Sequence, residues 1–153
     1  MRSREEVIRD FVEEWISKAE ADLTAAEILA AAETHDYFTC AFHCQQAAEK
    51  FLKAYLVRHQ IEFRKIHDLD QLLGLASQAE PALQEELASC NWLTPFGVEF
   101  RYPGDQPEVD RPTAQKAVAE AKRVRQAIME YLAPYLSSEG DEDPDSVDSV
   151  SSQ

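Results

Sequence analysis

The stretch that decides the fold is Phe42–Leu56, FHCQQAAEKFLKAYL, together with Ile66–Leu69, IHDL, further along the chain. If the first run is a helix, a step of about 100° per residue places polar and bulky apolar side chains on one face. That face combines Gln45, Glu49 and Lys53 with Phe38, Phe42, Leu52 and Leu56. An ordinary surface helix separates the two kinds, so this row is expected to be half-buried, with a partner for each polar group. The opposite side is apolar too, which places this helix at the centre of its bundle and leaves only the strip around His43, Gln46 and Lys50 for water.

Helical periodicity continues on both sides of this stretch. Apolar residues recur at three-and-four spacing, with breaks at Asp36, Gln60–Lys65 and Glu80-Pro81. This pattern predicts three long helices, over residues 4–33, 36–59 and 113–136, and two shorter ones that begin at 67–68 and at 81. Between Pro95 and Pro112 lie four of the seven prolines and two of the four glycines, which predicts a long loop before the last helix. The fold is therefore expected to be all-α, an antiparallel up-and-down bundle of four to five helices.

The charge of the chain is strongly acidic, with a formal net charge of −14. The last 17 residues, 137–153, hold six acids and no base, and the remainder has 23 acidic against 15 basic residues. We expect one domain over residues 1–136 and a disordered acidic tail over 137–153, because the tail has almost nothing to bury. An acidic body argues against a broad nucleic-acid-binding surface, so any nucleotide contact should be local.

Three cysteines and no signal-like or membrane-spanning apolar run indicate a cytoplasmic protein in a reducing compartment, without a membrane role. Cys40 and Cys44 are four residues apart on one predicted helix, with His43 between them. A Cys-x-x-x-Cys without a second ligand pair is a weak metal signal, so buried packing is favoured over zinc. No metal and no cofactor is expected.

The phrase Gln45–Lys50 (QQAAEK), then His67-Asp68-Leu69 and later Arg101-Tyr102-Pro103, resembles the HEPN family of small prokaryotic helical domains. The resemblance extends from about Trp15 to Leu136. Related domains bind nucleotides, pair into dimers, and work beside a separately encoded minimal nucleotidyltransferase. The resemblance implies the same fold and the same kinds of partner for this chain.

Six residues form the predicted ligand-binding set: Gln46, Glu49, Lys53, His67, Arg101 and Tyr102. Glu49 and Lys53 have the spacing of an intrahelical ion pair, which either only neutralises itself or faces a ligand or a second chain. Asp68 and His67 stand at a helix start, where capping is the simplest function and leaves His67 without a purely local role. Arg101 would either bind a phosphate or tie the loop to a carboxylate. Tyr102 would offer a stacking surface for a base.

Many HEPN proteins are ribonucleases with an arginine followed, four to six residues later, by a histidine. This chain has no such motif: Arg58 stands nine positions before His67, Arg64 only three, and no histidine follows Arg101. We therefore expect no catalytic residues and a non-catalytic, homodimeric HEPN domain that binds a nucleotide, a nucleotidyltransferase partner or both, in a toxin–antitoxin-like or stress-related system. The alternatives are a metal-independent ribonuclease with displaced catalytic residues, such as His67 and Arg101, and an assembly module without a ligand.

Overall fold

The computed structural model describes residues 1–33, 36–97, 104 and 107–138, and within them the regular structure is entirely helical. The elements are α1 (Arg4–Ala31), α2 (Tyr37–Arg58), α3 (Leu69–Ala79), α4 (Ala82–Glu86), the 3-10 helix η1 (Ala88–Phe96) and α5 (Arg111–Ser137). The all-α prediction is confirmed. None of the described helices is both long and apolar enough to cross a membrane.

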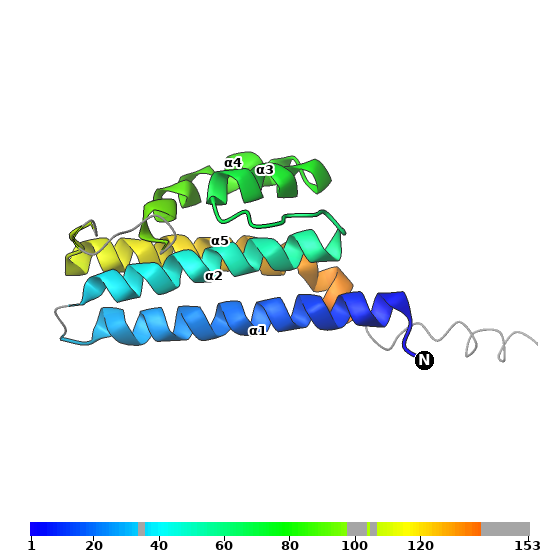
Figure 1. The fold of residues 1–153 in the computed structure, drawn as a ribbon, viewed down its shortest axis with the longest axis horizontal. Helices are drawn as coiled ribbons and strands as arrows, with labels where there is room; N and C mark the ends of the chain where they lie inside the picture. Colours follow the sequence, from blue (N-terminus) through cyan, green and yellow to red (C-terminus); the bar gives the residue numbers. More distant parts are fainter. Residues whose placement is uncertain (34–35, 98–103, 105–106, 139–153) are drawn as a thin grey trace, which may run out of the picture.

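Three long helices, α1, α2 and α5, lie alongside one another, and α1 and α2 run in opposite directions (Figure 1). The short helices α3 and α4 lie on the side of α2 away from α1 (Figure 1). Helix α2 packs against α1, α3, η1 and α5. Thirteen of its 22 residues are buried, as expected for the central helix of the bundle.

Side-chain caps explain where three of these helices begin. The Asp36 carboxylate accepts a hydrogen bond from the backbone N–H of Thr39, and Asp68 does the same for Gln71 at the start of α3. Asp110 caps α5 by accepting from the N–H of Thr113. Each carboxylate satisfies an N–H group that the first turn of a helix leaves without a partner. Capping by Asp36 and Asp68 was predicted from the sequence.

Among the helix boundaries that differ from the prediction, two have a clear local cause. Helix α5 begins at Arg111 rather than at Thr113, because Pro112 is tolerated in the first turn, where its missing N–H is not needed. The segment after Pro81, predicted as one helix, divides into α4 and the 3-10 helix η1. The sequence Ser89-Cys90-Asn91 has low helix propensity and Pro95 removes a donor, which explains the tighter and shorter turns there.

The loop predicted over residues 95–112 is shorter at both ends, since Pro95 and Phe96 belong to η1 and Arg111 and Pro112 to α5. Residues 98–103 and 105–106 of this loop lie outside the described part of the chain. The predicted tail begins within the last turn of α5, which reaches Ser137, and residues 139–153 of it also lie outside the described part.

Candidate functional site

Helix α2 carries three polar side chains inside the bundle. Gln45 is 1% exposed, Glu49 4% and Lys53 6%. Charged side chains are almost never buried to this degree unless they are paired, so each of the three needs partners. The sequence predicted a half-buried row, whereas the structure buries its three polar side chains almost completely.

Glu49 lies at the centre of this group. Its Oε2 is 3.2 Å from Nζ of Lys53, one turn further along α2, and its Oε1 is 3.2 Å from Nδ1 of His67. Nε2 of Gln45 donates to the same Oε1 over 3.3 Å. The predicted ion pair between Glu49 and Lys53 is therefore present, and the carboxylate has a partner on both oxygens. We call Gln45, Glu49, Lys53 and His67 the α2 polar cluster.

Two aromatic rings enclose the ammonium group of Lys53. Nζ is 5.6 Å from the centre of the Trp15 ring and 5.5 Å from that of Phe63. The two rings meet edge to face, with their centres 6.0 Å apart. A cation over aromatic faces gains electrostatic stabilisation, and here the rings also keep it from water. Trp15 belongs to α1 and Phe63 to the connection between α2 and α3.

His67 joins the cluster from the last turn before α3. Asp68 caps that helix, so the predicted capping role belongs to the aspartate, while the imidazole of His67 is directed at Glu49. The backbone N–H of Leu69 donates to Oγ1 of Thr94 in η1 over 3.2 Å. This contact holds the turn in place. The His67 side chain is 32% exposed, which makes it the most accessible member of the cluster.

Gln46 lies beside the cluster and is half-buried. Its Nε2 donates to Oε1 of Gln45 over 2.6 Å. Gly97, just after η1, packs on the same amide of Gln45: a Cβ at this position would lie 3.3 Å from both Cδ and Oε1 of Gln45. A larger residue at 97 would therefore displace the amide or the backbone.

Arg101 and Tyr102, both in the predicted ligand-binding set, lie outside the described residues. The structure brings together the other four, Gln46, Glu49, Lys53 and His67, either directly or through Gln45. Gly97, the last described residue before the gap at residues 98–103, lies against Gln45 at the edge of the α2 polar cluster.

Two residues of the α2 strip predicted to face water, His43 and Lys50, instead contact α1. Asp22 lies 2.8 Å from Nδ1 of His43 through one oxygen and 2.5 Å from Nζ of Lys50 through the other. Its side chain is only 13% exposed. The sequence does not show this contact, because Asp22 is far from both partners along the chain. The only signal for this contact in the sequence was a carboxylate in the first helix that could face the basic residues of α2.

Two of the cysteines lie in the packed interior of the bundle. Cys40 and Cys44 are fully buried between α1 and α2, and the Cys40 thiol donates to the carbonyl oxygen of Ala26 over 3.2 Å. The hydrogen bond with Cys40, reinforced by burial, raises the pKa of the Cys44 thiol far above its usual value. Within the described part of the chain, no group of three or more metal-ligating side chains forms.

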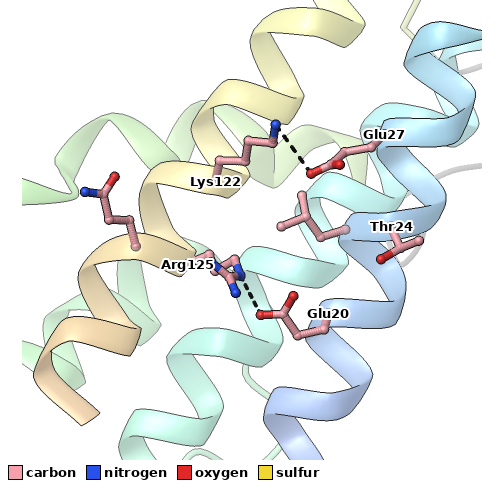
Figure 2. Close-up of a pocket in the computed structure, with 7 residues that line it drawn as sticks. Glu20, Thr24, Glu27, Lys122 and Arg125 are labelled. Carbon is pink, nitrogen blue, oxygen red and sulfur yellow. Dashed lines mark hydrogen bonds and ion pairs between the residues drawn. The ribbon is translucent and has the colours of Figure 1, made fainter. Parts of the chain in front are cut away.

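A groove of about 450 Å³ lies between α1 and α5, away from the α2 polar cluster. Figure 2 shows Glu20 and Glu27 of α1 facing Arg125 and Lys122 of α5, with the pairs 2.5 Å and 3.5 Å apart. These side chains are one-third to one-half exposed or more, and such surface pairs contribute little stability. None of the residues predicted to bind a ligand lines this groove.

The described part of the chain is thus an all-α bundle whose central helix carries a buried polar cluster. The family model described as "HEPN domain" matches residues 12–131. The chain belongs to the HEPN family, and the resemblance seen in the sequence is confirmed.

Two individual proteins are similar to it. "Putative toxin MJ1304" of Methanocaldococcus jannaschii is 28% identical over an alignment of 135 positions, and the match covers 77% of this chain and 86% of that protein. The crystal structure of ST0689, described as an archaeal HEPN homologue, has a TM-score of 0.64 and 26% identity, and the match covers 79% of this chain and 97% of that one.

Proposed function

We propose that this protein is a non-catalytic HEPN domain that forms a homodimer, binds a nucleotide, and works with a separately encoded minimal nucleotidyltransferase in a toxin–antitoxin-like system. The word "toxin" in the name of the relative from M. jannaschii supports the proposed toxin–antitoxin-like system. The nucleotidyltransferase partner rests on the family resemblance alone. The observation that carries the binding proposal is the α2 polar cluster.

A buried polar cluster is not required for the stability of a helical bundle. A helical bundle of this size is stabilised by apolar packing, and replacing a buried ion pair by apolar residues is often neutral or stabilising. Glu49 and Lys53 neutralise each other, so an approaching phosphate would not meet an uncompensated carboxylate. Gln46 and His67 are half-buried beside the pair and offer hydrogen bonds at its accessible edge. This arrangement supports a small, local ligand site.

Nucleotide binding can be tested by titrating the protein with a panel of nucleoside mono-, di- and triphosphates. Lys53→Ala is expected to weaken binding about tenfold or more, because it removes the cation that neutralises the Glu49 carboxylate close to the phosphate. Arg101→Ala should have an effect of similar size through the loss of a cationic phosphate contact. Lys18→Ala is the matched control, since Lys18 is an exposed lysine of α1 paired to Glu14.

Far-UV circular dichroism checks that each variant keeps its helical content. If both variants bind the panel as well as the parent, the site is placed wrongly. If the parent binds no nucleotide at millimolar concentration, the binding proposal fails and a ligand-free assembly module takes its place.

The homodimer is proposed from aromatic side chains that the chain itself does not fully cover. Phe38 and Phe42 on α2 remain half-buried, and Phe11 on α1 is 53% exposed. Aromatic residues are enriched in interfaces, and a two-fold contact could cover such side chains with a second copy of the chain. Sedimentation at micromolar concentration should give twice the chain mass of 17.3 kDa. Phe42→Glu should shift the protein to monomer, whereas a monomeric parent contradicts the proposal.

A second candidate function is metal-independent RNA cleavage, and one contact favours it. The Glu49 carboxylate 3.2 Å from Nδ1 of His67 is an arrangement that can orient an imidazole as a general base. Incubation with RNA in a chelator, comparing the parent with His67→Ala, decides between this candidate and the non-catalytic one.

A further inference from the structure

The amide of Gln46 is held by a chain of hydrogen bonds that starts inside the bundle. Nε2 of Gln45 donates to Oε1 of Glu49 over 3.3 Å and to the carbonyl oxygen of His67 over 3.4 Å. Both hydrogens of that nitrogen are therefore used. The Oε1 atom of Gln45 is left as an acceptor, and it takes the hydrogen bond from Nε2 of Gln46 over 2.6 Å.

The opposite orientation of Gln45 is disfavoured. Rotating its amide by half a turn would place an oxygen against the Glu49 carboxylate and the His67 carbonyl, where three acceptors would face one another. The close approach of Gly97 to Cδ and Oε1 of Gln45 leaves little room for movement. Since Gln45 must present an oxygen, Gln46 must present an N–H to it.

This fixes what Gln46 offers to a ligand. An amide nitrogen carries two hydrogens, and one of them points to Gln45, so the second hydrogen and the Oε1 atom of Gln46 are left for a ligand. The Gln46 side chain makes no further hydrogen bond within the described part of the chain. His43 and Lys50, which flank it on the same strip of α2, are both bound to Asp22 and so do not compete for its amide. One donor and one acceptor, side by side, are left at a half-buried position.

We propose that Gln46 recognises the base of the bound nucleotide and selects adenine. An adjacent amide donor and acceptor match the N7 acceptor and N6 amino donor of adenine, whereas guanine and hypoxanthine present acceptors at both positions. The oxygen of Gln46 would then face a second oxygen. This inference rests on the proposed nucleotide-binding function and specifies the ligand class for the same site.

The test compares AMP with IMP, which differ at the position that pairs with the Gln46 oxygen. Isothermal titration of the parent protein should show AMP binding about ten- to one hundredfold more tightly than IMP, the discrimination that one good bidentate pair provides. Gln46→Met keeps the side-chain length and helix propensity but removes both polar atoms, so its two affinities should become equal. Gln126→Met on the exposed face of α5 is the matched control and should keep the parent ratio.

The outcomes separate this inference from the proposed function. Equal binding of AMP and IMP by the parent overturns the role of Gln46 and leaves nucleotide binding standing. A preference for AMP that survives in Gln46→Met assigns the discrimination to another residue and also overturns it. If Gln46→Met fails to fold, Gln46→Glu replaces it in the test. Gln46→Glu lacks the N–H for N7 and should therefore lose the preference for AMP over IMP. If the parent binds neither AMP nor IMP, the role of Gln46 is overturned, and the full panel of nucleoside mono-, di- and triphosphates decides the proposed function separately.

Discussion

Replacing Glu49 with alanine is expected to lower the free energy of unfolding by about 3–5 kcal/mol, because it leaves the buried Lys53 ammonium without its anion. Lys53 is 6% exposed and has Nζ 3.2 Å from the carboxylate, so water cannot readily take the place of Glu49. The hydrogen bonds from Gln45 and His67 to the same carboxylate are lost as well. Urea denaturation followed by circular dichroism measures the change.

The chain contains a matched control for this experiment. Glu14 and Lys18 form a pair with the same spacing on α1, but their side chains are 58% and 60% exposed. Glu14→Ala should cost no more than about 0.5 kcal/mol, since exposed pairs of this kind contribute little. The double variant Glu49→Ala/Lys53→Met removes both buried charges and should recover part of the loss. Equal effects of Glu49→Ala and Glu14→Ala would contradict the burial of the cluster.

Phe51→Ala is expected to have an effect of the same order, about 3–5 kcal/mol, through a cavity at the centre of the bundle. Phe51 is fully buried on α2, the helix that packs against α1, α3, η1 and α5. The melting temperature should fall by many degrees, because a loss of this size is a large fraction of the stability of a small domain.

Phe11→Ala provides the comparison, since Phe11 is the same residue type but 53% exposed on α1. Phe11→Ala should lower the free energy of unfolding of the monomer by less than about 1 kcal/mol. Similar losses for the two variants would show that α2 is not the central helix.

The sequence alone predicted the helices and the centre of the bundle. Helical periodicity and capping are properties of neighbouring residues, so α1, α2 and the Asp36 and Asp68 caps could be predicted from one chain. The ion pair between Glu49 and Lys53 could be predicted for the same reason, because its partners are one turn apart. The family resemblance followed from the order of short motifs along the chain.

Tertiary structure decided everything that joins distant parts of the chain. Trp15 and Phe63 enclose Lys53, Asp22 binds His43 and Lys50, and the His67 imidazole faces Glu49 across the turn before α3. Periodicity tells which face of a helix is buried, but the register and rotation of one helix against another determine which side chains meet. A half-buried row on α2 was therefore predictable from the sequence, whereas its partners, and the hydrogen-bond chain that orients Gln46, depend on how the helices pack.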